Sequence, residues 1–432
     1  MVASVTLSVL LGLLVTKPHN SFDLRVYRGA VESWAFHGDL YGFGMGQRHS
    51  GFTYPPFAAL CMLPMVLLPL GTVTVINVSV MVASAAFVVR AYSARLSCFA
   101  GWGGWFAVGV LLPPLLLLQP LRDTLTFGQI NLELGALVVA DMLLLERGSR
   151  WAGVGAGLAT AMKLTPGLFI VFYLVSGRWR AAGTSLLTFG AVTLGAALVA
   201  PSTSWQFWTS TILDTNRVGS YDSATNQSVA GLLARLANSS DVPAVWVPIV
   251  ALVVVGVLLS ARRHVMTGDL PAAFVVVGLG ACAVSPISWV HHLWWIAPAL
   301  LVLVDRAIRA KSWIVAGMVV MVTLAFASGA PDIARVKAGH HHDSLGTLVG
   351  ENLYGVFVLV MLLLLAGVRR RVGRELVMTA VPKALGHRSG QQLPAGGSGC
   401  LTRVDSDSKP SGALQKNPRG RLSAKQGGSG QP

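Results

Sequence analysis

The sequence predicts an all-α, polytopic membrane protein. Hydrophobic residues make up 53% of the 432 residues, and the mean hydropathy is +0.62. Charged residues make up only 12%, against about 25% in a typical soluble domain. Apolar runs of membrane-spanning size recur along the chain. A soluble globular fold is excluded, because so few charged residues could not cover so much apolar surface in water. Disorder over most of the length is excluded as well, because disordered chains are poor in hydrophobic residues.

Two polar stretches, 17–56 and 201–241, interrupt a series of apolar runs. The first run, residues 2–16, resembles the core of a signal peptide but lacks its basic start and its cleavage site, so we predict a short first membrane helix. The apolar runs are 2–16, 57–92, 101–118, 128–146, 151–163, 165–176, 181–200, 243–260, 270–284, 293–305, 312–328 and 347–367.

The region 57–118 leaves two alternatives open, and both give about 12 transmembrane helices with both chain ends on the same side. Either 57–92 forms two short helices, broken near Pro69, and 101–118 is re-entrant. Or 57–92 is one long bent helix and 101–118 spans, interrupted by Pro113 and Pro114. Arg90 and Arg95 favour the second alternative, because basic residues mark cytoplasmic helix ends.

Basic loops orient the predicted bundle. The tail 369–432 holds 12 Lys and Arg against 3 Asp and Glu, so it carries +9 of the net charge of +15. Under the positive-inside rule this tail is cytoplasmic, and its composition predicts disorder after a transmembrane domain of residues 1–368. The basic excess therefore gives no reason to expect a nucleic-acid partner. Loops 119–131, 201–241, 285–292 and 329–346 then lie outside, where the polar motifs collect.

Asp23 lies in the first of these motifs, in the polar stretch that follows the first run. Apolar residues in 23–38 are spaced as on one helical face, which predicts a short amphipathic helix at the outer membrane surface. Asp23 then has two interpretations. It is the N-cap of that helix, or it is a catalytic carboxylate that acts as general base toward a hydroxyl acceptor.

The second motif is Phe52-Thr53-Tyr54-Pro55-Pro56-Phe57, and the third runs from Pro120 to Asn131. The prolines of the second motif indicate a helix start, while Tyr54 could offer a hydroxyl or a stacking face to a sugar. In the third motif Arg122, Gln129 and Asn131 suit sugar hydroxyls or a phosphate. Local capping and an Arg122–Asp123 ion pair explain that motif equally well.

The fourth motif places Lys163 alone between two apolar runs, as a snorkelling lysine or a phosphate partner. The fifth, Ser285 to Trp295, contains His291 and His292 among tryptophans. Tryptophans suit the membrane interface, whereas the histidines suggest a phosphate contact or a proton-transfer role. Adjacent histidines diverge on a helix, so we predict no metal site. Neither the four cysteines nor the polar run 339–343 changes that expectation.

Taken in order, these motifs resemble one family: the actinobacterial polyprenol-phosphate-mannose-dependent α-(1→2)-mannosyltransferases, glycosyltransferase family 87, with the C-type membrane glycosyltransferase fold. The resemblance includes the sequence Asn226-Gln227-Ser228 and covers residues 22–292, and the helix pattern extends to about 368. It implies that mannose moves with inversion from polyprenyl-phosphate-mannose to a mannose 2-hydroxyl of a glycolipid. The implied acceptors are a phosphatidylinositol mannoside, lipomannan or lipoarabinomannan.

Carried onto this chain, the resemblance makes Asp23 the general base and places His291 or His292 near the donor phosphate. The other motif positions are expected to bind the donor phosphate or sugar: Lys163, Arg122, Gln129, Asn131, Tyr54, Asn226 and Gln227. Asp123 departs from the family pattern and brings a negative charge beside Arg122. No cofactor is implied.

The resemblance further implies an active site on the outer face of the cytoplasmic membrane, where the partners are lipids. Two alternatives stay open at this stage. One is a glycosyltransferase with another lipid-linked donor, such as arabinose. The other is a lipid or solute transporter, which predicts charged residues near the membrane midplane and related broken helices in two halves.

Overall fold

The computed structural model describes residues 20–46, 50–214, 217–338 and 345–367, without the side chains of 335–338. Every described residue belongs to one structural unit that ends at residue 372. The predicted first helix (2–16), the histidine run at 340–342 and the tail (369–432) lie outside the described residues. The division into a membrane domain and a disordered cytoplasmic tail therefore stays a prediction.

The described part of the chain is helical, which confirms the all-α class. Its β pairing is limited to two isolated bridges, Met45–Ser50 and Asn226–Trp289. In the first half the helices are α2 (Phe22–His37), α3 (Pro56–Met62), η1 (Leu63–Leu67), α4 (Leu70–Ser93), η2 (Ser97–Phe99), α5 (Gly104–Leu116), α6 (Gln119–Phe127), α7 (Asn131–Glu146), α8 (Val154–Met162), η3 (Thr165–Gly167), α9 (Leu168–Val175) and α10 (Trp179–Val199). In the second half they are α11 (Pro201–Thr209), η4 (Thr211–Leu213), α12 (Val229–Leu236), α13 (Trp246–Met266), α14 (Leu270–Val284), η6 (Val290–Trp295), α15 (Ile296–Ala310), α16 (Trp313–Ser328), α17 (Ala330–Ala338) and α18 (Leu345–Gly367).

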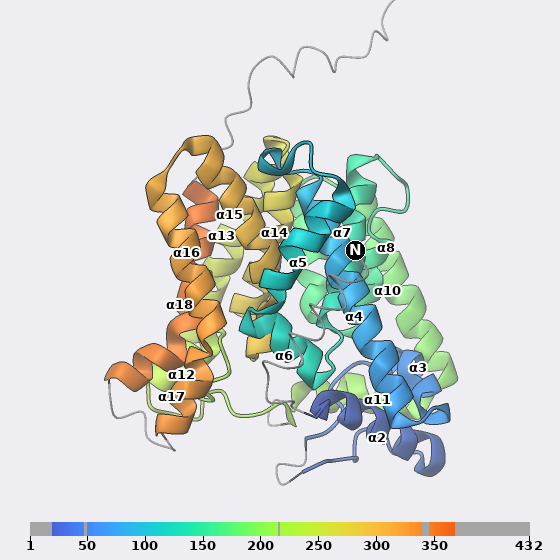
Figure 1. Ribbon diagram of the computed structural model, residues 1–432. Helices are drawn as coiled ribbons and strands as arrows, with labels where there is room; N and C mark the ends of the chain where they lie inside the picture. Colours follow the sequence, from blue (N-terminus) through green and yellow to red (C-terminus); the bar gives the residue numbers. More distant parts are fainter. Residues whose placement is uncertain (1–19, 47–49, 215–216, 339–344, 368–432) are drawn as a thin grey trace, which may run out of the picture. The chain divides into compact units, whose positions relative to one another are not determined.

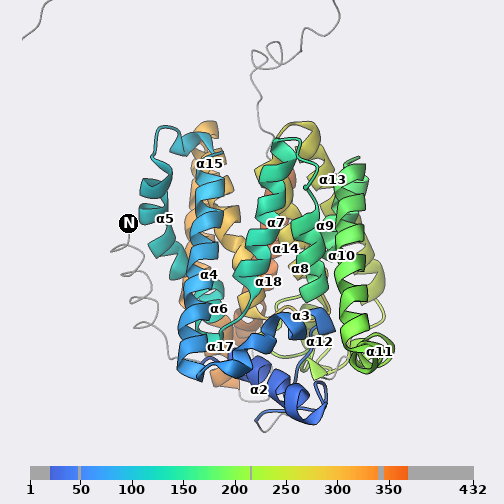
Figure 2. The same cartoon turned by 90° about the vertical axis from the view of Figure 1, so that its right-hand side faces the viewer.

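The long helices run side by side, and the short helices α2, α3, α11, α12 and α17 gather at one end of the bundle (Figures 1 and 2). The connections α7–α8, α9–α10, α13–α14 and α15–α16 lie at the opposite end. Basic residues lie in these four connections or in the adjoining helix turns, and the positive-inside rule predicts all of them on the cytoplasmic side: Arg147 and Arg150, Arg178 and Arg180, Arg262 and Arg263, and Arg306 to Lys311. Helices that cross a membrane in alternating directions require these connections to share one end of the bundle, and they do. The side of the membrane on which that end lies stays a prediction.

Within the described ranges, four helices are long and apolar enough to cross a membrane: α4, α10, α13 and α18. The pair α5 and α6 passes the same test together but is bent by 85°, so it is a broken span or a re-entrant segment. The described helices therefore indicate a multi-pass membrane protein, and the count of about 12 crossings stays a prediction.

For 57–118 the break near Pro69 in the first alternative is confirmed, and the single long helix over 57–92 in the second is wrong. The first run divides at Leu68 and Pro69 into a short segment (56–67) and the long helix α4. In the second run Pro113 and Pro114 lie inside α5, and the break falls at Leu117, from which the chain continues around the bend into α6. Two consecutive prolines each remove one backbone donor without ending this helix, because packing sustains it.

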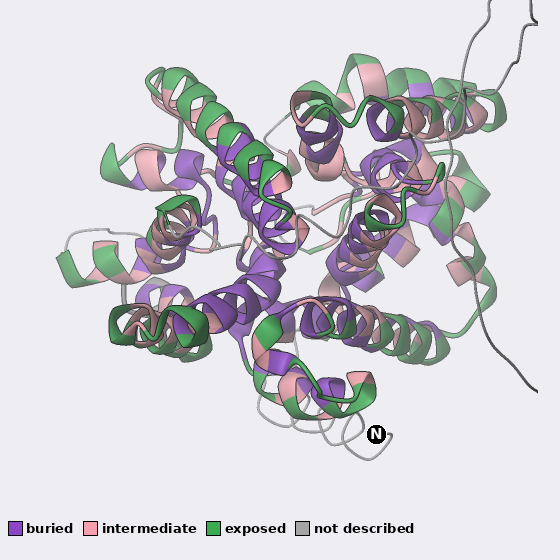
Figure 3. Cartoon of the chain, turned by 90° about the horizontal axis from the view of Figure 1, so that it is seen from above, coloured by how far each residue is buried: buried purple, intermediate pink, exposed green. Residues whose placement is uncertain are grey.

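Large apolar side chains cover the outward faces of the bundle. Trp313, Leu198 and Leu187 are 89%, 85% and 76% exposed. Viewed along the bundle, exposed residues lie on the outer faces of the helices and buried residues line their inner faces (Figure 3). An outer surface of this kind is expected where lipid, not water, is the surrounding solvent.

The helices α8 and α9 are nine and eight residues long, roughly half of what a bilayer crossing needs. The chain turns back between them at Lys163. Asp141 of α7 fixes the start of α8: its carboxylate accepts hydrogen bonds from the backbone N–H groups of Gly155 (3.1 Å) and Ala156 (2.8 Å). A carboxylate at a helix N-terminus satisfies its free donors and favours its dipole.

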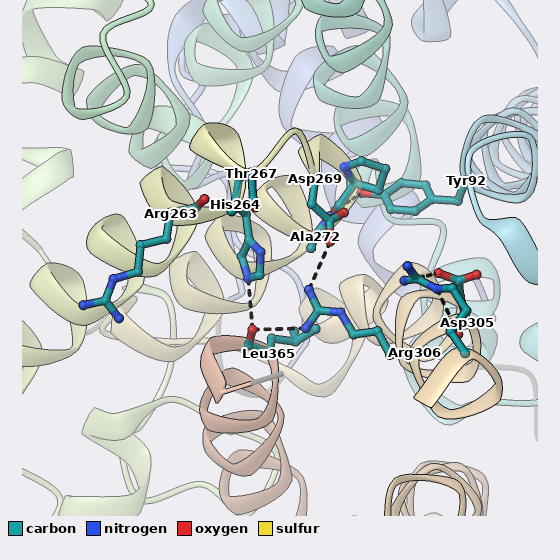
Figure 4. Close-up of polar contacts among 11 residues, drawn as sticks. Tyr92, Arg263, His264, Thr267, Asp269, Ala272, Asp305, Arg306 and Leu365 are labelled. Carbon is teal, nitrogen blue, oxygen red and sulfur yellow. Dashed lines mark hydrogen bonds and ion pairs between the residues drawn. The ribbon is translucent and has the colours of Figure 1, made fainter. Parts of the chain in front are cut away.

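A buried polar cluster joins α13, α14, α15 and α18 (Figure 4). Arg306 forms an ion pair with Asp269 at 3.3 Å, with side chains 2% and 4% exposed. Arg306 also donates to the carbonyl oxygen of Leu365 at 3.1 Å, and His264 Nε2 donates to the same oxygen at 2.9 Å. Because these side chains are partnered inside the fold, the cluster ties the end of α18 to the bundle.

Candidate active site

A cavity of about 570 Å³ opens among the short helices. This volume is typical of a site for a small-molecule or sugar headgroup. Segments far apart in the sequence line it: the start of α2, the loop before α3, the α6–α7 and α8–η3 connections, the loop after η4, and the segment that leads into η6. It brings together six of the predicted site residues: Asp23, Tyr54, Gln129, Lys163, His291 and His292.

Asp23 lies in the first turn of α2, and the N-cap position is occupied by Ser21, not by Asp23. The N-cap interpretation of Asp23 is therefore wrong by two residues. The Asp23 side chain lines the cavity, where its Oδ2 accepts a hydrogen bond of 2.6 Å from Gln129 Nε2. An ionised carboxylate with a donor on one oxygen is a suitable general base toward a bound hydroxyl.

Two backbone features bring Asp23 and Gln129 together. The backbone N–H of Ser21 donates to the carbonyl of Thr126 at 3.0 Å. Gly128 ends α6 in the left-handed conformation (φ 74°), and a Cβ at this position would lie 2.7 Å from Leu24 Cβ. Glycine therefore permits both the turn and the close approach of α2.

Lys163 and His292 form the cationic side of the cavity. Lys163 Nζ donates to Asn131 Oδ1 at 2.9 Å and lies 3.0 Å from His292 Nε2. The other ring nitrogen, Nδ1, faces the backbone N–H of Trp289 at 3.2 Å, and a neutral imidazole accepts from only one of these two donors. Lys163 therefore points into the cavity beside the histidine, which favours the phosphate-partner interpretation over the snorkelling one.

Burial shapes the protonation of this pair. It lowers the pKa of Lys163 to about 8, against which the nearby Asp23 and Cys282 act in the opposite direction. Burial, followed by Lys163 and His291, holds the pKa of His292 well below its usual value. At neutral pH the pair thus offers the Lys163 ammonium, with a neutral imidazole beside it, to a phosphate oxygen.

Asn226 and Gln227 hold the histidine segment in place. Asn226 Oδ1 accepts the backbone N–H of Ser288 at 2.9 Å, and Ser288 O accepts the backbone N–H of Gln227 at 2.7 Å. The Gln227 amide bonds Glu351 O and Gly355 N of α18. Both amides lie outside the set of residues that line the cavity, so their predicted contact with the donor stays a prediction that this geometry does not support.

The remaining predicted site residues, Asn131 and Arg122, differ in their position relative to the cavities. Asn131 lines a smaller neighbouring cavity of about 50 Å³, which also contacts Lys163 and His292. Arg122 lies outside the lining of both cavities, whereas its neighbour Asp123 lines the larger one. The departure from the family pattern at Asp123 therefore matters for the site, and the donor-phosphate role of Arg122 stays a prediction without a contact.

Sequence reasoning missed three residues that line the cavity: Arg217, Asp332 and Tyr27. Asp332 and Asp123 share a donor, because Gln119 Nε2 bonds both carboxylates at 2.7 and 3.0 Å. Arg217 and Asp332 stand in no recognisable motif. Tyr27 does lie in the Asp23 segment, one helical turn further along, and its spacing was the one available signal.

The described part of the chain contains no group of three or more His, Cys, Asp or Glu side chains that could hold a metal ion. The predictions of no metal and no cofactor remain untested by that finding.

A multi-pass helical membrane protein with a carboxylate and a lysine–histidine pair facing one cavity fits one class: membrane enzymes that transfer a group from a phosphate-linked donor. The sequence profile of glycosyltransferase family 87 matches residues 52–286. This chain belongs to glycosyltransferase family 87.

Curated relatives agree. The chain is 33% identical over 303 residues to a polyprenol-phosphate-mannose-dependent alpha-(1-2)-phosphatidylinositol mannoside mannosyltransferase of Mycobacterium tuberculosis, covering 65% of this chain and 69% of that protein. It is 31% identical to the protein of the same description from Mycolicibacterium smegmatis, covering 67% and 71%. A phosphatidylinositol pentamannoside mannosyltransferase of M. tuberculosis is also 31% identical, covering 68% of each chain. No solved structure matches the chain.

Proposed function

We propose that this protein transfers mannose from polyprenyl-phosphate-mannose to a mannose 2-hydroxyl of a phosphatidylinositol mannoside, with formation of an α-(1→2) linkage. The observation that carries the proposal is the pairing of two chemistries on one cavity: the Asp23 carboxylate, and the Lys163–His292 pair. Family membership and the descriptions of the three relatives supply the donor and the acceptor class.

The reaction follows from these groups. Asp23 takes the proton of the acceptor 2-hydroxyl as that oxygen attacks the anomeric carbon of the donor mannose. The bond between the anomeric carbon and the phosphate oxygen breaks on the opposite face, which inverts the β-linked donor to an α product. Polyprenyl phosphate leaves as an anion, and the Lys163 ammonium, with His292 beside it, stabilises it without a general acid.

Lipid substrates require a site at a membrane surface. We place the cavity on the outer face of the cytoplasmic membrane, with the four basic connections and the tail in the cytoplasm, because positive loops favour that side. The short helices around the cavity then lie at the lipid headgroups, where both donor and acceptor expose their sugars.

The test uses purified protein in lipid nanodiscs with a short-chain polyprenyl phosphomannose and phosphatidylinositol mannosides of different length. We expect a product that α-(1→2)-mannosidase removes, and a loss of about 10²- to 10⁴-fold in Asp23→Asn, as for removal of a general base. Asp39→Asn, an exposed carboxylate near the end of α2, is the matched control.

The same assay decides among the alternatives. Lipomannan and lipoarabinomannan fragments test a larger acceptor, and a polyprenyl phosphoarabinose tests the other donor. No transfer by folded protein with any of these pairs would refute the proposal and bring the transporter interpretation forward.

A further inference from the structure

Three buried side chains form a chain of hydrogen bonds that ends on Asp23. Tyr27 Oη and Tyr54 Oη lie 2.9 Å apart, Tyr54 Oη donates to Gln129 Oε1 at 3.1 Å, and Gln129 Nε2 donates to Asp23 Oδ2 at 2.6 Å. Tyr27, Tyr54 and Gln129 are 5%, 7% and 5% exposed. Hydrogen bonds shielded from water in this way hold their geometry more firmly than exposed ones.

The direction of each bond follows from the donors available. A flipped Gln129 amide would place its oxygen 2.6 Å from a carboxylate oxygen, so the Nε2 group must face Asp23. Tyr54 has one hydroxyl proton, which it gives to Gln129, so Tyr27 is the donor to Tyr54. Burial raises the pKa of both tyrosines, and both therefore remain protonated donors throughout the working pH range.

Tyr54 also contacts the other half of the site. Lys163 Nζ lies over its ring, 5.3 Å from the centroid, which is within the range of a cation–π interaction. The backbone carbonyl of Tyr54 accepts a hydrogen bond of 2.9 Å from Tyr41, and its ring packs edge-on against Phe52 at 5.7 Å. One fixed side chain thus contacts Lys163 through its ring face, and Gln129 through its hydroxyl.

We propose that Tyr54 is a positioning residue that sets the separation of the general base from the phosphate-binding cation. Its hydroxyl orients Asp23 through Gln129, with Tyr27 as the terminal donor, and its ring face holds Lys163. This inference rests on the proposed function, and it gives Tyr54 and Gln129 a different task from the donor binding that the sequence suggests.

Two substitutions separate the two contacts of Tyr54. Tyr54→Phe keeps the ring and removes the hydroxyl. We expect kcat to fall about 10- to 100-fold, with the KM for the donor within about twofold of the wild type. Tyr54→Leu removes the ring as well, and we expect the same loss of kcat with a donor KM raised about threefold or more.

The pH profile distinguishes positioning from general damage. Gln129→Leu removes the donor to Asp23, so the charged carboxylate is less stabilised and the acidic limb of kcat/KM moves up by about one pH unit. Tyr54→Phe moves it in the same direction by less. The control is Tyr92→Phe, which we expect to keep the wild-type profile. It removes another buried tyrosine hydroxyl, which lies on α4 and donates to Pro271 O at 3.4 Å.

A measurement that needs no activity keeps this proposal distinct from the proposed function. Infrared pH-difference spectra of the wild type minus those of Asp23→Asn isolate the Asp23 carboxyl band. In Gln129→Leu and Tyr54→Phe that band grows in at higher pH than in the wild type.

An unchanged titration in both variants overturns the positioning role, and so does a wild-type kcat in Tyr54→Phe. If the wild type transfers no mannose but the titration moves as expected, the proposed function fails and the positioning role stands.

Discussion

Removal of the Lys163 ammonium should weaken donor binding in a pH-dependent way. Lys163 offers a charged donor to the cavity, and a hydrogen bond to a charged partner contributes about 1.5–3 kcal/mol. Lys163→Met therefore reduces the affinity for polyprenyl phosphate, the anionic product, by roughly 10- to 150-fold at pH 7. The variant keeps the length of the side chain, so Asn131 and His292 retain an apolar neighbour of similar size.

The pH dependence has a definite sign. Burial lowers the pKa of Lys163 to about 8 in the free protein, and a bound phosphate anion raises it again. Affinity is therefore nearly complete at pH 7, about half of its full value at pH 8, and lower by up to about tenfold at pH 9, as the ammonium deprotonates. Lys163→Met has already lost this group, so its weaker affinity is level across the same range.

Calorimetric titration of a short-chain polyprenyl phosphate into nanodisc-embedded protein measures both quantities. Proton uptake on binding at pH 8.5, read from buffers of different ionisation enthalpy, should be present in the wild type and absent from Lys163→Met. Equal affinities of the two proteins at pH 7, or a wild-type affinity that is constant between pH 7 and 9, would refute the reasoning.

Three further outcomes follow from packing and charge. Asp269→Ala leaves Arg306 buried without its anion and should destabilise the fold by about 3–5 kcal/mol, whereas replacing both residues with leucine costs far less; chemical denaturation measures both. Gly128→Ala should lower both thermal stability and kcat, because its Cβ would collide with α2; Gly38→Ala, with a similar φ of 76° and open space around it, should change kcat less than twofold. Deletion of 375–432 should leave mannosyl transfer intact, and a large loss of activity would contradict a dispensable tail.

Much of the site could be predicted from sequence because its residues stand at marked interruptions. Prolines follow Tyr54 and Lys163, a glycine precedes Gln129, and a proline and tryptophans accompany the histidines. Prolines and glycines inside apolar runs indicate where the chain leaves a regular helix. The cavity contacts Asp23, Tyr54, Gln129, Lys163, His291 and His292, as a common site requires.

Other parts could not be predicted, because they depend on contacts between distant segments. Asp332 reaches the cavity from α17, more than 200 positions after Asp123, and one amide holds the two carboxylates together. The task of Gln129 could not be read from a motif either, because an amide suits a sugar and a carboxylate equally. Arg122 illustrates the converse: its residue type fits a phosphate, but the rotation of α6 presents Asp123 to the cavity instead.

Several residues of the site lie where helices are interrupted. Backbone that leaves a regular helix in an apolar bundle is tolerated where it lines a polar cavity, because its free groups then find partners. Gln129 follows the break after α6, Lys163 lies at the turn between two half-length helices, and His292 lies in the 3₁₀ segment before α15. Uninterrupted helices would have placed these side chains at different levels along the bundle or on different faces of their helices. A substitution that regularised one break, such as Gly128→Ala, should therefore damage catalysis more than its cost in stability implies.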